Sequence, residues 1–98
     1  MRIASEDPNL ALAGLRIEIE KELLNLASRH GISTNRYSVM QIAKELTQQN
    51  VFGAGAYLAV GDLMGLLNNA VHGAKVEPAS VAWALDAGTQ LVESLRSK

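Results

Sequence analysis

The chain has 98 residues, which is the size of one domain whose modest core buries about two thirds of the surface exposed by the unfolded chain. Hydrophobic residues make up 48% of the chain, but only one Trp, two Tyr and one Phe are present, so the core must be built from Leu, Ile, Val and Ala. This composition favours closely packed helices and predicts an all-α fold. Nine basic and ten acidic residues give a net charge of -1, which excludes a strong field for nucleic acid, and the absence of cysteine excludes disulfides and thiolate metal sites.

The first predicted helix opens with Asp7 as N-cap and Pro8 as first helical residue, and it ends at Gly31. At 100° per residue its side chains fall into three sets. One apolar stripe holds Leu12, Leu15, Ile19, Leu23 and Leu26, a second holds Ala13, Ile17 and Leu24, and a polar set expected in water holds Glu18, Glu22, Asn25 and Arg29. Two apolar stripes predict two neighbouring helices.

Arg16 and Glu20 lie in the strip between these stripes, together with Ala27. Their (i, i+4) spacing predicts an ion pair inside a wide apolar face. We expect the pair to be partly buried and hydrogen-bonded, with Arg16 directed toward the bundle interior or an interface. The alternative is that both stems lie along apolar surface while the charged heads reach water.

A second helix is predicted over residues 39–49, because Ser38 and Gln41 form a capping box. The segment "NVFGAGAY" follows, and it lacks the third glycine, the preceding strand and the lysine of a phosphate-binding loop. A third helix is predicted over residues 56–72.

Gly73 is the expected terminator of the third helix, and a fourth helix is predicted to run from Pro78 to about Leu95. Four helices with short connections indicate a compact bundle. The sequence therefore predicts one helical domain over residues 1–98, in which residues 1–6 form a flexible N-terminus.

The third helix carries Gly61, Gly65, Asn68 and His72 on the side opposite its apolar face. Glycine inside a helix costs about 1 kcal/mol relative to alanine, so two on one line indicate close approach by a helix, a second subunit or a ligand. The competing interpretation is a plain helix end, where Asn68 and His72 satisfy backbone groups and His72 gains from the negative end of the helix dipole.

Two segments resemble the HEPN superfamily, the helical domains named for nucleotide binding in higher eukaryotes and prokaryotes. These are "LRIEIEKELLNLA" in the first helix and "LLNNAVHGAKV" at the end of the third, and the similarity covers nearly the whole chain. Active HEPN ribonucleases carry an arginine, a polar residue, a few more residues and a histidine, usually at a dimer interface. Asn68 matches the polar position, His72 the histidine and Gly73 the glycine that often follows, but Leu67 stands where the arginine is expected.

The missing arginine argues against catalysis, because that cation would bind the scissile phosphate and stabilise the transition state. The only other histidine, His30, ends the first helix, and no carboxylate has metal-ligand spacing to His72, so neither a metal nor another cofactor is expected. The resemblance then implies a non-catalytic interaction or dimerisation module, of a bacterial defence or RNA-linked system, that pairs with itself or joins a larger protein.

Two alternatives stay open. One is a degenerate ribonuclease in which Arg16 supplies the cation beside His72. The other is a small-ligand or nucleotide-sensing domain whose pocket follows the glycines 61 and 65 to Asn68, with Arg16 and Glu20 as further binding residues.

The single tryptophan, Trp83, lies off the core stripe of the fourth helix. That stripe contains Val81, Ala84, Leu85, Gly88, Leu91, Val92 and Leu95. Because tryptophan is enriched where interfaces concentrate their energy, Trp83 is predicted to lie at or near a dimer contact. The alternative is that the N-terminal segment or the loop around Phe52 covers it within one chain.

No run of 18 apolar residues and no signal-peptide pattern is found in the sequence. We therefore expect a cytoplasmic protein without membrane insertion.

Overall fold

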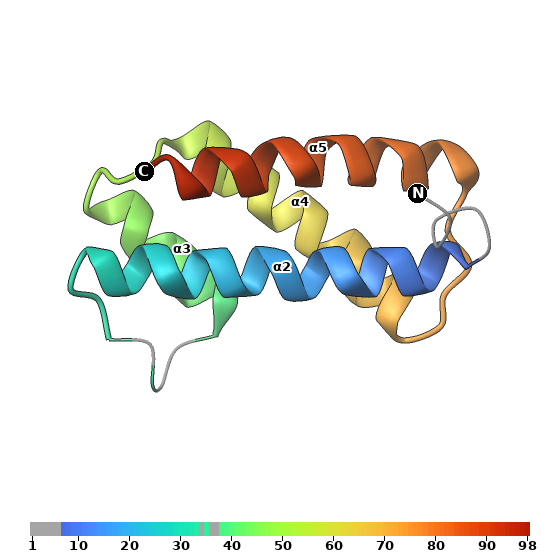
Figure 1. Ribbon diagram of the computed structural model, residues 1–98, viewed down its shortest axis with the longest axis horizontal. Coiled ribbons are helices and arrows are strands. Elements are labelled where there is room, and N and C mark those ends of the chain that lie inside the picture. The colour runs from blue at the N-terminus through green and yellow to red at the C-terminus, as the bar shows by residue number, and fades with distance from the viewer. Residues whose placement is uncertain (1–6, 34, 36–37) are drawn as a thin grey trace.

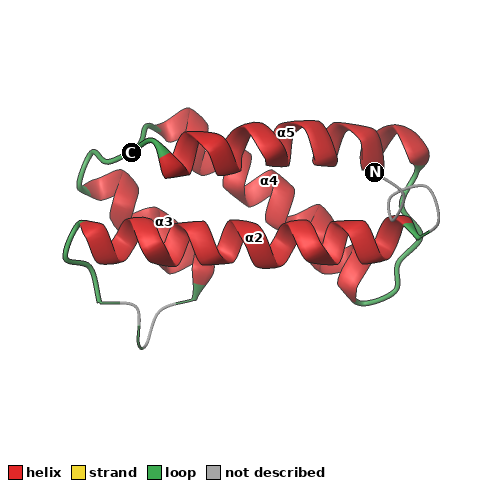
Figure 2. Ribbon diagram, viewed as in Figure 1, coloured by secondary structure: helices red, strands yellow, loops and turns green. Residues whose placement is uncertain are grey.

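Four helices form the described part of this computed structural model, which comprises residues 7–33, 35 and 38–98. They are α2 (Pro8–Arg29), α3 (Val39–Gln48), α4 (Ala54–Val71) and α5 (Pro78–Arg96), and these described residues contain no strand. The predicted all-α bundle of about four helices is therefore confirmed (Figure 2). The N-terminus predicted to be flexible, residues 1–6, lies outside the described residues.

The starts of α2 and α3 follow the sequence signals. The side chain of Asp7 accepts a hydrogen bond of 3.2 Å from the backbone N–H of Leu10, and Pro8 is the first helical residue. Ser38 and Gln41 form the predicted capping box, with reciprocal hydrogen bonds of 3.2 and 2.8 Å. The start of α4 differs, because the helix begins two residues before the predicted Ala56 and includes Gly55 in its first turn.

Three helices end in the same way, with a residue of positive φ just beyond the last turn. Gly31 has φ 73° after α2, Asn50 has φ 59° after α3, and Gly73 has φ 85° after α4. The next backbone N–H in each case donates to a carbonyl five residues back, at 2.9, 2.9 and 3.0 Å. This pattern is a Schellman motif, and it satisfies carbonyls that a helix end would otherwise leave without partners.

α2 and α5 lie side by side and run in the same direction (Figure 1). α4 crosses behind them in roughly the opposite direction, and α3 packs behind the C-terminal half of α2. The side chain of Asn9, in the first turn of α2, donates to the carbonyls of Ala70 and Ala74 at the end of α4, at 3.2 Å each. α2 therefore touches the other three helices.

Aliphatic side chains from all four helices fill the core. The largest fully buried ones are Leu12, Ile19, Leu23, Leu26, Ile42, Leu46, Val60, Leu63, Leu67 and Leu95. Phe52, in the connection between α3 and α4, is also buried in this cluster, whereas Trp83 remains 48% exposed. The loop around Phe52 therefore packs into the core and does not cover the exposed part of Trp83.

α2 packs tightly against α5 at Gly88. A Cβ atom added to Gly88 would overlap both Cδ atoms of Leu15. An alanine at position 88 would therefore have to displace the end of the Leu15 side chain. The sequence pattern places Gly88 in the core stripe and gives no sign of this contact.

The second apolar stripe of α2 was expected to face a neighbouring helix, but none of the described helices covers it. Ala13 is half-buried, while Ile17 is 63% and Leu24 is 40% exposed. The neighbours of α2 instead pack on the two edges of the first stripe, with α5 on the side of Glu18 and Glu22 and α4 on the side of Arg16. The second apolar stripe is left facing solvent.

No helix in the described ranges has the length and apolar character needed to cross a membrane.

Candidate functional site

A polar contact between α2 and α4 joins the residues singled out in the sequence. The Nε atom of Arg16 donates to the Oδ1 atom of Asn68 at 2.7 Å, and its Nη2 atom lies 3.1 Å from a carboxylate oxygen of Glu20. The side chains of Arg16 and Glu20 are 33% and 28% exposed, so the predicted partial burial and hydrogen bonding of this pair are confirmed. Arg16 thus reaches the helix that carries His72, but its charge is already compensated by Glu20.

His72 is the C-cap of α4 and is exposed. Its backbone N–H donates to the carbonyl of Asn68 at 3.1 Å, and the Schellman hydrogen bonds of Gly73 and Ala74 close the helix directly after it. The side chain of Asn9 satisfies further carbonyls at this helix end. The segment "LLNNAVHGAKV" therefore has a complete structural role as a helix terminus.

Leu67 occupies the position where the resemblance expects an arginine, and it is fully buried in the core. A side chain at this position points away from the exposed side of α4 on which Asn68 and His72 lie. Leu67 has no charge or hydrogen-bond donor in its side chain and does not bind a phosphate near His72.

The glycines of α4 are not at a tight helix contact. A Cβ atom on Gly61 would lie 3.6 Å from the Cε atom of Met40, which is an ordinary contact, and one on Gly65 would meet no atom within 4 Å. The close approach predicted from these glycines is therefore not made among the described residues, and at Gly65 the surface is open.

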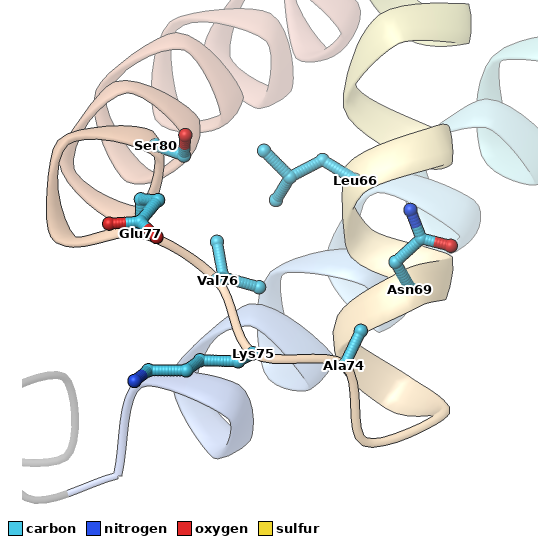
Figure 3. A pocket seen from close by; sticks show the side chains of 7 residues that line it. All are labelled: Leu66, Asn69, Ala74, Lys75, Val76, Glu77 and Ser80. Atoms are coloured by element: carbon cyan, nitrogen blue, oxygen red, sulfur yellow. The ribbon is translucent and has the colours of Figure 1, made fainter.

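A shallow hollow of about 420 Å³ lies beside the end of α4, at its connection to α5 (Figure 3). It shares no residue with the line from Gly61 to His72 along which a pocket was expected. The residues lining it are Leu66, Asn69, Ala74, Lys75, Val76, Glu77 and Ser80. Lys75 extends away from Leu66 and Asn69, so its ammonium group is not an anchor for an anion in this hollow.

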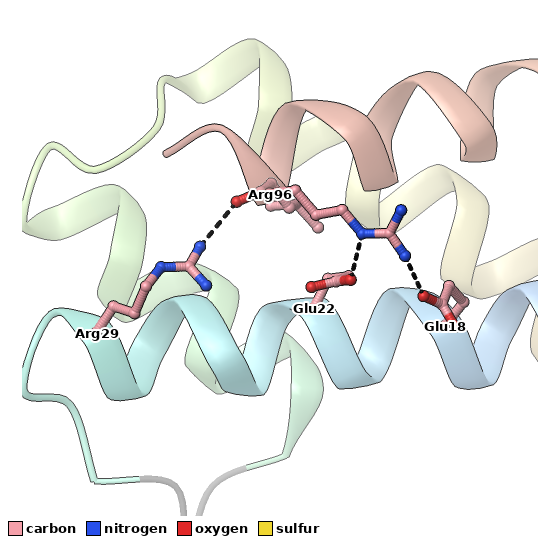
Figure 4. Close-up of polar contacts among 5 residues, drawn as sticks. Glu18, Glu22, Arg29 and Arg96 are labelled. Carbon is pink, nitrogen blue, oxygen red and sulfur yellow. Dashed lines mark hydrogen bonds and ion pairs between the residues drawn. The ribbon is translucent and has the colours of Figure 1, made fainter.

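A charged cluster joins α2 to α5 (Figure 4), although the sequence pattern predicts that its α2 residues lie in water. Arg96 donates from Nε to Glu22 and from Nη2 to Glu18, both at 2.6 Å, and Arg29 donates to the carbonyl of Leu95 at 3.0 Å. Glu22 is only 5% exposed, so its expected solvation is wrong. The reason is that α5 covers this side of α2 and brings Arg96 to the two carboxylates.

Arg96 also changes the titration of its partner. Its hydrogen bond to the Glu22 carboxylate lowers the pKa of that group below 4.5, against the opposing effect of burial. The carboxylates in turn raise the pKa of Arg96. The cluster is therefore a charged link between two helices, in which one guanidinium contacts both carboxylates and the three groups together keep a charge of -1.

Large apolar side chains on the surface form the remaining candidate site. On α2, Leu10 is 58% and Ile17 is 63% exposed, and Leu24 continues the same side of the helix. A groove of about 510 Å³ adjoins Leu10 between α2 and α5. Its lining is mostly apolar and consists of Leu10, Ala11, Gly14, Leu15, Glu18, Leu85 and Thr89.

No protein family model matches the chain, and neither does any curated protein or solved structure. The resemblance to the HEPN superfamily therefore rests on the residues of the chain itself, chiefly Asn68, His72 and Gly73.

The described residues form no cluster of three or more His, Asp or Glu side chains that could hold a metal ion. Among the arrangements described above, the surface of α2 that carries Leu10, Ile17 and Leu24 is apolar and open, whereas Arg16 and Arg96 are each paired with carboxylates. The exposure of this α2 surface could not be predicted from the sequence, because exposure depends on where the other helices pack.

Proposed function

We propose that this chain is a non-catalytic, HEPN-like helical interaction module that pairs with a second copy of itself. The observation that carries the proposal is the exposure of large apolar side chains along α2. Monomeric proteins tolerate isolated apolar residues on the surface, but a row of them beside an apolar groove is typical of a protein interface.

The expected strength of this pairing follows from the exposed fractions of Leu10, Ile17 and Leu24, which are 58, 63 and 40%. Full burial of one such side chain contributes about 1.5–3 kcal/mol, so burial of these surfaces in two protomers contributes roughly 5–10 kcal/mol. Association itself costs about 4–15 kcal/mol. We therefore expect a weak dimer that exchanges with monomer.

Sedimentation equilibrium of the full chain between about 10 and 500 µM tests the proposal, since a weak dimer dissociates within this range. The expected result is a weight-average mass that rises from the monomer value toward twice that value. A mass that stays at 10.5 kDa across the whole range would contradict self-association.

Two observations support the proposal that the chain is not a catalyst. Leu67 is fully buried, and the guanidinium of Arg16 is compensated by Glu20. Neither position therefore supplies the uncompensated cation next to His72 that a phosphodiester transition state would need.

A degenerate ribonuclease is the second candidate, because the 2.7 Å hydrogen bond from Arg16 to Asn68 joins a cation to the helix that ends at His72. In this case RNA cleavage by the purified protein would disappear with His72→Ala and also with Arg16→Gln. Glu20→Gln, which frees the guanidinium, would raise the rate.

A further inference from the structure

The exposed face of α2 has a regular spacing. Leu10, Ile17 and Leu24, here called the α2 stripe, recur every seven residues and are all exposed. Such spacing keeps the three side chains on nearly one side of the helix, with a drift of about 20° per repeat, at intervals of roughly 10.5 Å. The stripe is thus a straight apolar row centred on Ile17.

We propose that the occupant of the α2 stripe is the α2 helix of a second copy, aligned antiparallel about a two-fold axis at Ile17. The proposal rests on the proposed function and specifies its interface. Ile17 then meets Ile17 of the second copy, and Leu10 meets Leu24 of the second copy at both ends. The equal spacing on both sides of Ile17 makes the stripe complementary to itself, as a two-fold interface requires.

Charges beside the stripe fit the antiparallel alignment. Arg16 and Glu20 form one flank of the stripe and already contact each other at 3.1 Å. In an antiparallel pair this flank faces its own copy, and the 1.5 Å rise per residue places Arg16 only about 3 Å along the axis from Glu20 of the second copy. Along the axis the order is then Glu20, Arg16, Arg16, Glu20. The two approaches of opposite charge outnumber the single approach of the two arginines.

A small residue on the other flank leaves room for the partner helix. A Cβ atom added to Gly14 would meet nothing within 4 Å. In the antiparallel alignment Lys21 of the second copy lies on this flank, about 1.5 Å from Gly14 along the axis. Antiparallel packing also places the positive end of each helix dipole beside the negative end of the other.

The contact area accounts for a weak pair. The antiparallel overlap of residues 8–26 is roughly 27 Å long and 10 Å wide, which is on the order of 300 Å² of footprint per protomer. A standard interface buries about 800 Å² per partner. The α2 pairing therefore belongs with small, exchanging interfaces, which agrees with the weak dimer expected above.

Trp83 lies on a different face of the molecule. Leu85 and Thr89 line the groove beside α2, and Arg96 binds Glu18 and Glu22, so these residues mark the side of α5 that faces α2. Trp83 precedes Leu85 by two residues, a rotation of about 200°, and therefore projects away from α2. Substitution of Trp83 therefore tests a dimer contact around Trp83 without changing the α2 stripe.

Because the chain has no cysteine, single cysteines can test the alignment directly. Ile17→Cys, Leu10→Cys and Leu24→Cys would each be treated with a bis-maleimide linker of about 10 Å, which spans the usual distance between packed helices. Leu58→Cys on α4, where Leu58 is 64% exposed, measures cross-linking by random collision. Unchanged melting temperatures would show that each variant is folded.

The expected result is dimer cross-linking by Ile17→Cys alone, and by a mixture of Leu10→Cys with Leu24→Cys, several-fold above the Leu58→Cys background. Leu10→Cys alone and Leu24→Cys alone should stay at background. Cross-linking of either of these two alone would indicate parallel helices and overturn the alignment, and Ile17→Cys at background would overturn the α2 interface.

Sedimentation separates failure of this inference from failure of the proposed function. Ile17→Gln should raise the dimer dissociation constant at least tenfold, whereas Trp83→Ala should leave it unchanged. A dimer that resists Ile17→Gln but is lost with Trp83→Ala would overturn the α2 interface and still support self-association. A wild-type protein that stays monomeric would overturn both the α2 interface and the proposed self-association.

Discussion

Replacing Gly88 by alanine tests the close contact between α2 and α5. The new Cβ atom would overlap the Cδ atoms of Leu15, and overpacking of this kind costs about 1–3 kcal/mol. Alanine is also the better helix former, by about 1 kcal/mol. The expected net loss is therefore about 1 kcal/mol in the free energy of unfolding, or roughly 4–8 °C in melting temperature for a domain of this size.

A double-mutant cycle with Leu15→Ala isolates the overlap. Without the Leu15 side chain, Gly88→Ala should stabilise the protein by about 1 kcal/mol, because only the helix propensity remains. The coupling between the two substitutions is thus expected to be roughly 2 kcal/mol. Urea unfolding, followed by circular dichroism and by Trp83 fluorescence, measures each free energy.

Gly65→Ala is the matched control, since a Cβ atom there would meet nothing within 4 Å. It should raise the free energy of unfolding by about 1 kcal/mol. If Gly88→Ala stabilises the wild type as much as Gly65→Ala does, and its coupling to Leu15→Ala is within about 0.3 kcal/mol of zero, the tight contact between α2 and α5 is refuted.

Three further predictions concern the helix end, the charged cluster and activity. Asn50→Gly should stabilise the chain by a few tenths of a kcal/mol in thermal unfolding, because Asn50 has φ 59° and glycine adopts this conformation without strain; a lower melting temperature would contradict this. Since the pKa of Glu22 in the folded protein lies below 4.5, the unfolded chain binds this proton first as the pH falls. The free energy of unfolding should therefore decrease from about pH 4.5 downward through the folded pKa. Urea unfolding at a series of pH values measures this decrease, and Glu22→Gln should make it smaller. Purified protein should not cleave RNA, and Leu67→Arg should not create activity because Leu67 is fully buried; cleavage that depends on His72 would refute this prediction.

The helix ends could be predicted because their signals are local. Asp7, Pro8 and Gly31 act within one turn of their own positions, and Gly73 terminates α4 as expected. The core face of α5 was likewise predictable, because a periodic apolar pattern reports which side of a helix is buried.

The environment of α2 could not be predicted in the same way, because its neighbours come from distant parts of the chain. Glu22 has the sequence pattern of a solvated residue and is buried by α5, whereas Ile17 has the pattern of a core residue and is exposed. Gly88 gave no signal of its contact, since its partner Leu15 lies on another helix. The contact of Arg16 with Asn68 could not be predicted either, because it depends on how α2 and α4 cross.

The parallel pairing of α2 with α5 has a consequence for the order of folding. The hydrogen bonds from Arg29 to Leu95, from Arg96 to Glu22 and from Arg96 to Glu18 span 66, 74 and 78 residues of sequence. Contacts of such long range require closure of a large loop and form late. On a ribosome that adds about 5–20 residues per second, α2 waits several seconds for α5, with Leu15 and Glu22 still uncovered on the side that α5 later packs against. A nascent chain in this interval exposes apolar surface that α5 covers in the finished bundle, and this surface is a binding site for a chaperone.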